Sequence, residues 1–195
     1  MDIKIFFAIL ASVIGIIAFI PYLRDIFTYK TKPHAYTWLI WIITQGTAVV
    51  AMFYGGAIWG MLSLAIGLIF ILFIFLSSLK FGTKDITRSD TIVLIFALLS
   101  IVVWWQLKQP LLSVIMISVI DMCGFFPTFR KTYKDPWSET LSSWGLFIIS
   151  NFLAILAMNE YNFFTLFYIL IINTANIVLF VIAIIRRKII KKEVL

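Results

Sequence analysis

The chain has 195 residues, of which 63% are hydrophobic and 13% are charged, and its formal net charge is +7. Soluble domains average about 45–50% apolar and about 25% charged residues, so this composition excludes a water-soluble domain and also a disordered chain. A single cysteine, Cys123, excludes an intramolecular disulfide and a multi-cysteine metal site.

Seven apolar runs along the chain are each long enough to cross a bilayer, which takes roughly 17–25 mostly apolar residues. Proline, glycine, asparagine and charged residues separate the runs, as is typical of loops. We therefore predict an all-α membrane protein with seven transmembrane helices. In chain order they are Lys4–Tyr22, Tyr36–Tyr54, Ala57–Leu79, Asp90–Leu107, Pro110–Thr128, Ser138–Met158 and Asn162–Ile185.

The first run lies where a signal peptide would lie. Its basic residues follow the apolar stretch instead of preceding it, and no small-residue cleavage site comes after it. This arrangement favours a permanent transmembrane helix over a cleaved leader.

The lysines and arginines fall on one side of this predicted topology. All but Lys4 and Lys108 of the 16 cationic residues lie in the loops that follow the odd-numbered helices or in the tail 186–195. Because cytoplasmic loops are enriched in Lys and Arg, we predict a cytoplasmic C-terminus and an external N-terminus in the plasma (inner) membrane. The tail is interpreted as an orientation signal, with lipid or partner binding as the alternative.

The sequence is similar to itself when it is shifted by 106 residues. Between 12–24 and 118–130, six of 13 positions are identical, and the register continues to Trp38 and Trp144. Four crossings separate the two starts, so both copies would face the same way. We predict two parallel three-helix repeats and a linker helix, a 3+1+3 arrangement. Its units are 1–79, the linker 80–109, 110–185 and the basic tail 186–195.

The arrangement and the residues around two prolines resemble the SWEET sugar transporter and PQ-loop superfamily. Pro21 is followed at the motif spacing by Lys30-Thr31, and Pro127 holds the matching place in the second copy. Tyr22 and Thr128 replace the glutamine of the motif. The resemblance implies a small solute carried by alternating access between the two repeats. Nicotinamide riboside transporters and KDEL-receptor-like proteins resemble the same fold and are alternatives.

Amides and aromatic rings recur at equivalent places in the two copies. Trp38, Trp41 and Gln45 share one helix face, and Trp144, Phe147 and Asn151 share the equivalent face. Such a set suits a neutral polar solute, because amides hydrogen-bond it and rings stack on it. The amides could instead only join helices. For Trp38 and Trp144 an interfacial belt or a gate is favoured over direct binding.

The last predicted helix carries two asparagines on one face, Asn173 and Asn176. The resemblance implies an asparagine facing the substrate on the third helix of each unit, which makes both of them candidate binding residues. In the first copy, Ser63 is the partial counterpart.

Three further residues carry mechanistic predictions. Pro21 and Pro127 weaken the helical hydrogen bonding near the cytoplasmic ends of their helices, and we interpret them as gate hinges rather than ordinary helix ends. Asp121 is the one acid well inside a predicted span, where a charge is costly. It is a candidate for proton coupling or cation recognition, or else a buried acid bonded to a hydroxyl such as that of Ser118.

The sequence thus predicts a carrier of a small polar solute, sugar-like or a neutral metabolite, with proton coupling as an option. The alternatives are a receptor or sensor of the same fold, or a vitamin or amino-acid carrier. We expect no enzymatic activity, because no nucleophile–base set or HExxH motif is present. The expected partners are the solute and the lipid bilayer, with a homo-oligomer left open. No nucleic acid, cofactor or metal is expected.

Overall fold

The computed structural model describes residues 3–54, 58–106, 110–158, 161 and 163–191. Within these ranges it leaves out the side chains of 47–48, 50–54, 58–64, 100–101, 103–105, 110–114 and 163–165. The described residues form seven α-helices and one 3₁₀ helix, without strands, so the all-helical prediction is confirmed. The helices are α1 (Ile3–Phe27), α2 (Ala35–Tyr54), α3 (Ile58–Phe81), α4 (Arg88–Gln106), α5 (Pro110–Lys134), η1 (Pro136–Ser138), α6 (Leu141–Ala157) and α7 (Phe163–Ile189).

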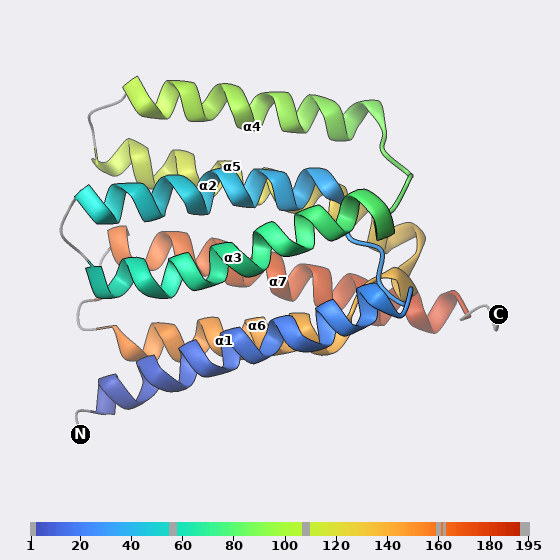
Figure 1. Ribbon diagram of the computed structural model, residues 1–195, viewed down its shortest axis with the longest axis horizontal. Coiled ribbons are helices and arrows are strands. Elements are labelled where there is room, and N and C mark those ends of the chain that lie inside the picture. The colour runs from blue at the N-terminus through green and yellow to red at the C-terminus, as the bar shows by residue number, and fades with distance from the viewer. Residues whose placement is uncertain (1–2, 55–57, 107–109, 159–160, 162, 192–195) are drawn as a thin grey trace.

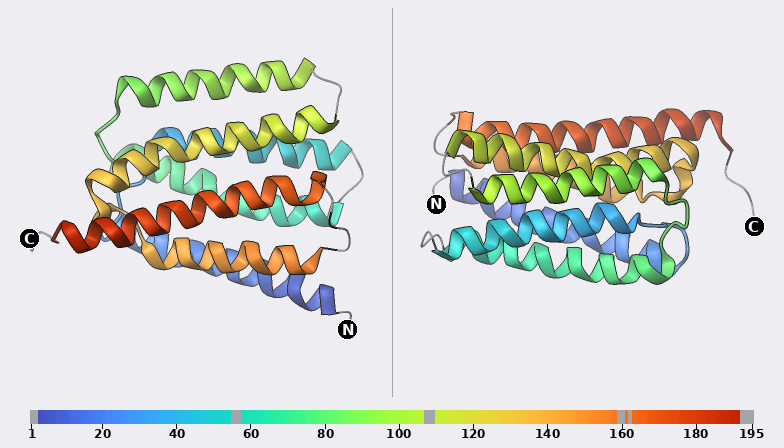
Figure 2. Two further views of the ribbon diagram at one scale, coloured as in Figure 1. Left: turned by 180° about the vertical axis from the view of Figure 1, so that it is seen from behind. Right: turned by 90° about the horizontal axis from the view of Figure 1, so that it is seen from above.

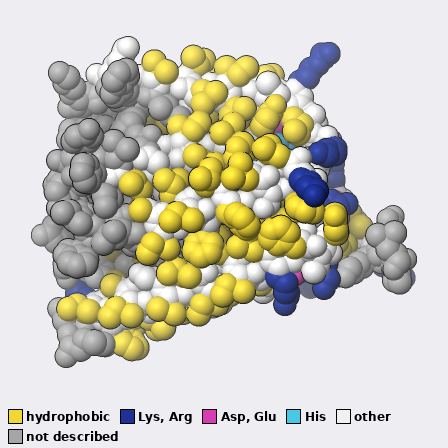
Figure 3. Space-filling view, in the orientation of Figure 1, with side chains coloured by type: hydrophobic (Ala, Val, Ile, Leu, Met, Phe, Trp, Pro, Cys, Tyr) yellow, Lys and Arg dark blue, Asp and Glu magenta, His cyan; other side chains and the backbone are white. Residues whose placement is uncertain are grey.

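The seven α-helices lie alongside one another, and the two termini lie at opposite ends of the molecule (Figures 1 and 2). The loops 28–34 and 82–87 and the segment 135–140 gather at the end where the C-terminus lies. Lysine and arginine side chains concentrate at this end in the space-filling view (Figure 3). We call it the basic end.

The helix contacts follow the same pattern in the two halves. In the first half α3 packs against α2 and α1, and in the second half α7 packs against α5 and α6. The halves meet where α1 packs against α6 and where α2 packs against α5. The linker helix α4 lies at the edge of the molecule and contacts α5 and α2 (Figure 1).

Large apolar side chains cover much of the outer surface (Figure 3). Ile20 of α1, Ile69 of α3, Phe96 of α4 and Phe152 of α6 are all more than half exposed. Soluble monomers rarely expose contiguous apolar surface on this scale. Among the described residues, two helices are long and apolar enough to cross a membrane, Ile3–Phe27 and Leu166–Ile189. Ala65–Phe81 and Leu141–Ala157 are shorter apolar helices.

Several predicted boundaries are wrong at the basic end. The boundary between 79 and 80 falls inside α3, and the one between 185 and 186 falls inside α7, so the predicted tail begins as helix. Likewise, α1 and α5 run on beyond the predicted ends Tyr22 and Thr128. The prediction ended these helices close to where charged residues begin, whereas the charged residues Arg24, Lys80, Arg130 and Arg186 continue the helices.

The sixth helix begins later than the predicted Ser138. Pro136 starts the short 3₁₀ helix η1, and the Asp135 carboxylate caps it by accepting a hydrogen bond from the Trp137 backbone N–H at 3.2 Å. Helix α6 begins only at Leu141. The segment 135–140 therefore forms a separate structure at the basic end.

Candidate functional site

A cavity of about 170 Å³ lies between the two halves. Six helices line it: α1, α2 and α3 from the first half, and α5, α6 and α7 from the second. Half of the residues in its wall are aromatic, and the wall also has five polar groups from α2, α6 and α7 and one acid from α5. The polar members are Thr44, Gln45, Asp121, Asn151, Tyr168 and Asn176.

Much of the cavity wall consists of residues related by the shift of 106 positions. Four such pairs line it, each with one member from either half: Phe19 and Phe125, Trp38 and Trp144, Trp41 and Phe147, and Gln45 and Asn151. The structure thus brings together the amide and aromatic faces that the sequence analysis selected separately in the two copies.

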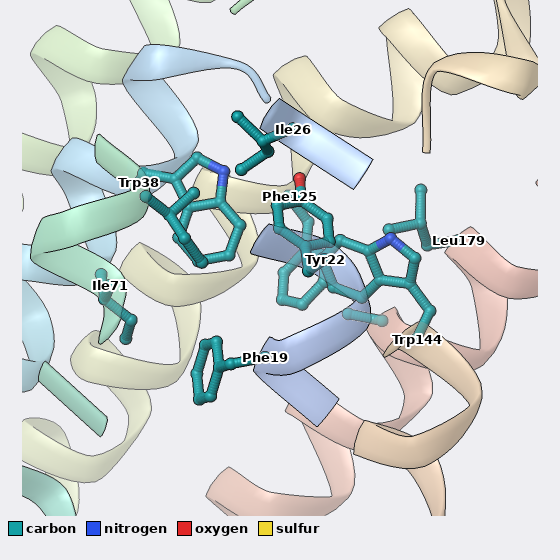
Figure 4. Close-up of a cluster of buried hydrophobic side chains, with 10 residues drawn as sticks. Phe19, Tyr22, Ile26, Trp38, Ile71, Phe125, Trp144 and Leu179 are labelled. Carbon is teal, nitrogen blue, oxygen red and sulfur yellow. The ribbon is translucent and has the colours of Figure 1, made fainter. Parts of the chain in front are cut away.

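Aromatic rings close the cavity toward the basic end. Figure 4 shows Tyr22 and Phe125 between the indoles of Trp38 and Trp144. Trp38 and Trp144 are each only 2% exposed. The alternative of an interfacial belt is therefore wrong for both, because belt residues lie at the outer surface. Trp41 is at the centre of the cluster, with its ring centroid 4.8 Å from that of Phe125 and 5.1 Å from that of Trp38.

A buried polar cluster lies behind these rings, centred on Glu139. The Glu139 carboxylate forms an ion pair with Lys131 and accepts hydrogen bonds from Trp144 Nε1 at 2.8 Å and from the Tyr22 hydroxyl at 3.5 Å. Lys131 also donates to the backbone carbonyl of Lys32 at 2.6 Å. We call Glu139, Lys131, Tyr22 and Trp144 the Glu139 cluster. It joins α1, α5, α6 and the loop before α2 at the basic end.

Threonine hydroxyls extend this closure on both sides. Thr140 donates to the Asp25 carboxylate at 3.0 Å and lies 2.5 Å from the Thr31 hydroxyl. Between α2 and α5, the hydroxyls of Thr37 and Thr128 are 2.8 Å apart. These contacts tie the two halves together at the basic end, where Asp25, Thr31, Glu139 and Thr140 also line a second cavity of about 1000 Å³.

Asp121 lies in the cavity wall and is only 4% exposed. Its Oδ2 accepts a hydrogen bond from the Tyr168 hydroxyl of α7 at 2.6 Å, whereas its buried Oδ1 has no hydrogen-bond partner among the residues that the structure describes. The Trp41 indole N–H reaches the Asp121 backbone carbonyl at 3.4 Å. The nearby Thr44 hydroxyl donates to the Trp41 carbonyl, also at 3.4 Å.

The other predicted binding residues divide into three groups. Gln45, Asn151 and Asn176 line the cavity, and Asn176 also donates to its own helix at the Ile172 carbonyl, 3.0 Å away. Asn173 is buried but does not line the cavity, and within the described part of the chain its Oδ1 has no hydrogen-bond partner. The side chain of Ser63 lies outside the described residues.

Gly67 and Gly124 provide room for the cavity side chains. A Cβ on Gly67 would lie 2.7 Å from Gln45 Nε2, and one on Gly124 would lie 2.8 Å from Trp41 Nε1. Neither side chain could keep its place beside a larger residue.

The two predicted hinge prolines lie inside helices rather than at their ends. Pro21 is half-buried and is followed by six more residues of α1, and Pro127 is buried and followed by seven more of α5. Each helix lacks one backbone hydrogen bond there, between the cavity and the polar groups of the basic end.

Sequence reasoning missed the Glu139 cluster and also the burial of His34, which lies in the loop before α2. His34 is fully buried, with Nε2 3.4 Å from Asp90 Oδ2. Burial lowers the His34 pKa to about 4 despite the adjacent carboxylate. The burial of His34 could not be predicted, because the sequence does not show which loop residues fold inward. In the described part of the chain, no group of three His, Cys, Asp or Glu side chains could hold a metal.

Comparisons with known proteins assign no family to the chain: no family model matches it, and neither curated proteins nor solved structures give a match.

Proposed function

We propose that the protein is an integral membrane carrier that moves a small polar solute by alternating access between its two halves. In this proposal all seven α-helices cross the bilayer. The basic end faces the cytoplasm, and the N-terminus lies outside the plasma membrane. The resemblance to SWEET and PQ-loop transporters suggested this function, and the arguments below rest on the chain's own residues.

The exterior supports the membrane location. Apolar side chains cover the flanks of the helices, and lysine and arginine gather at one end (Figure 3). A bilayer has an apolar interior that matches those flanks, and the positive-inside rule would place the charged end in the cytoplasm.

The cavity is the observation that carries the proposal. It lies between the halves, its walls include four residue pairs related by the repeat register, and it combines amides with rings. Carriers with internal repeats hold their substrate near the midplane where the repeats meet. The Glu139 cluster closes the cytoplasmic side, and the two mid-helix prolines supply flexible points between this closure and the cavity.

Access from both sides of the membrane is the property to test. In a Cys123→Ala background, Gln45→Cys in proteoliposomes should react with membrane-impermeant thiol reagents applied from either face. The control Lys84→Cys, exposed in the loop at the basic end, should react from one face only. In parallel, vesicles preloaded with small polar metabolites should lose some of them in a protein-dependent manner, as followed by mass spectrometry.

The results separate the alternatives. Reaction of Gln45→Cys from one face only, without loss of any metabolite, would overturn the carrier. Ligand binding without flux would identify a receptor of the same fold. Dependence of flux on a pH gradient would assign proton coupling.

A further inference from the structure

The cavity wall holds a buried carboxylate oxygen that has no hydrogen-bond partner among the described residues. Asp121 Oδ1 is shielded from water by the helices and receives no hydrogen bond from the described residues. Buried acceptors in proteins are nearly always satisfied. An unsatisfied carboxylate oxygen in a cavity wall is therefore a place for a positive or hydrogen-bond-donating group of a ligand.

Aromatic rings line the same cavity as this carboxylate. Trp41, Phe125 and Trp144 come from three helices, and the Trp41 centroid lies 4.8 Å from that of Phe125 and 6.3 Å from that of Trp144. The faces of such rings attract cations, and aromatic cages are the usual recognition element for quaternary ammonium groups. A carboxylate beside such rings supplies the compensating charge.

Among the described residues that line the cavity, none offers Asp121 a cationic partner. The helices packed against α5 are α2, α4, α7 and η1. The cavity-lining groups that they present to Asp121 are Thr44 and Gln45 from α2 and Tyr168 from α7, all uncharged. The lysine of the Glu139 cluster is already paired with Glu139. A cation at Asp121 must therefore come from a ligand.

The volume limits the size of the ligand. A cavity of about 150 Å³ in another protein holds one benzene molecule, and the cavity here is about 170 Å³. A disaccharide is too large for this space, whereas a compact ammonium compound of the bulk of choline fits it.

We propose that the transported solute is a small organic cation whose ammonium group binds between the Asp121 carboxylate and the Trp41, Phe125 and Trp144 rings. The amides of Gln45, Asn151 and Asn176 then bind the polar remainder of the molecule. That this cation is carried across the membrane rests on the proposed carrier function. The binding site itself stands on the cavity alone.

Binding to the purified full-length protein in detergent tests the site without requiring transport. Choline is the probe, and its control is the neutral alcohol in which carbon replaces the choline nitrogen. Isothermal titration and thermal shift should show choline binding at least about tenfold tighter than the neutral alcohol, since an ion pair in a partly dry site discriminates strongly.

Two variants localise the charge. Asp121→Asn, which keeps the side-chain size, should weaken choline binding roughly tenfold or more and change binding of the neutral alcohol little. The matched control Asp85→Asn removes an acid that is exposed and pairs with Arg130 outside the cavity, and it should leave choline binding unchanged. If Asp121→Asn does not fold, the preference of the wild-type protein for choline over the alcohol still decides.

Each result has one meaning. Equal binding of choline and the neutral alcohol, or displacement of choline by an equal concentration of sodium ion, overturns the ammonium site and leaves the carrier proposal standing. Choline binding that depends on Asp121 but is accompanied by no flux of choline in proteoliposomes supports the site and contradicts the carrier.

Discussion

The two contacts between the halves, α1 with α6 and α2 with α5, use equivalent positions in different ways. Between α1 and α6, Gly15 lies against Ser150: a Cβ on Gly15 would be 3.0 Å from Ser150 Oγ, and this hydroxyl donates to the Ala11 carbonyl at 2.8 Å. Between α2 and α5, the positions related by the 106-residue shift hold Asp121 and Thr44, and both line the cavity. Gly15 lets α1 and α6 pack closely, whereas Asp121 at the equivalent position of α5 contributes a carboxylate to the cavity wall.

The difference teaches how a repetitive framework can hold an asymmetric ligand. The paired aromatics and amides are common to both halves, whereas the acid belongs to only one of them. An organic cation also has one charged end. The four experiments below test whether the two contacts are as different as their residues indicate.

The largest loss of stability is expected for a substitution in the Glu139 cluster, which joins helices from both halves. Glu139→Gln removes the negative charge that compensates Lys131, which is only 3% exposed. Breaking a buried pair costs about 3–5 kcal/mol, because the remaining charge stays buried. The free energy of unfolding in detergent, measured by chemical denaturation, should fall by this amount.

A surface pair provides the control for this variant. Lys134→Met removes a cation that is 58% exposed and pairs with Asp85, and exposed pairs contribute about 0–1 kcal/mol. If Glu139→Gln were as stable as Lys134→Met, the Glu139 cluster would not hold the two contacts together.

The second largest effect is a pH dependence of stability that comes from His34, a position with a titratable side chain only in the first half. His34 precedes α2, and its equivalent before α6 is Thr140, which does not titrate. The charged groups that act on His34 are Asp90, Lys131 and Arg130, and burial still lowers its pKa to about 4. The unfolded histidine takes up a proton near pH 6.5, whereas the folded one stays neutral until about pH 4.

Stability should therefore fall as the pH is lowered from about 6.5 to about 4, by up to about 1.4 kcal/mol per pH unit. Above this window the histidine is neutral in both states and contributes no slope. Because acids also titrate in this range, the measured quantity is the difference between wild-type protein and His34→Gln. Parallel unfolding curves of the two proteins across the window would show that His34 is not buried in solution.

Much of the framework could be predicted, because long apolar runs and a repeated register are properties of the sequence itself. The shift of 106 positions selected Trp38 with Trp144 and Gln45 with Asn151, and all four line one cavity. The match arises because equivalent helix faces turn toward the same boundary between halves.

The rest depended on pairings that the sequence does not encode locally. Lys131 was predicted in a loop and Glu139 at the start of the sixth helix, and only the packing of α1, α5 and α6 buries them together. The sequence likewise did not distinguish the two neighbouring asparagines, which it named together as candidates: Asn176 lines the cavity and Asn173 does not, although they share a helix face.

The third test adds one methyl group to each contact. Gly15→Ala should crowd Ser150 and lower stability by about 1 kcal/mol, without changing choline binding. Gly124→Ala would place its Cβ 2.8 Å from Trp41 Nε1 and 3.2 Å from Ile40 Cγ2, so the Trp41 indole must move away from Asp121. Choline binding should weaken several-fold in Gly124→Ala alone. Equal losses of binding in both variants would mean that the two contacts respond as one unit.

The smallest effects come from removing one hydroxyl on each side. Ser150→Ala loses the hydrogen bond to Ala11, and such bonds between membrane helices contribute about 0.6 kcal/mol on average. The equivalent Thr44→Val keeps the volume and removes a weak bond of 3.4 Å to the Trp41 carbonyl together with a polar contact to the Asp121 side chain, so its unfolding free energy should stay close to that of the wild-type protein. However, Thr44 lies in the cavity wall near Asp121, and a methyl group in place of its hydroxyl should lower choline affinity by about twofold to threefold. Denaturation should then show the larger loss of stability for Ser150→Ala, and titration calorimetry should show the larger loss of choline affinity for Thr44→Val. Identical rankings would contradict the division between a packing contact and a binding contact, because both hydroxyls would be serving the same purpose.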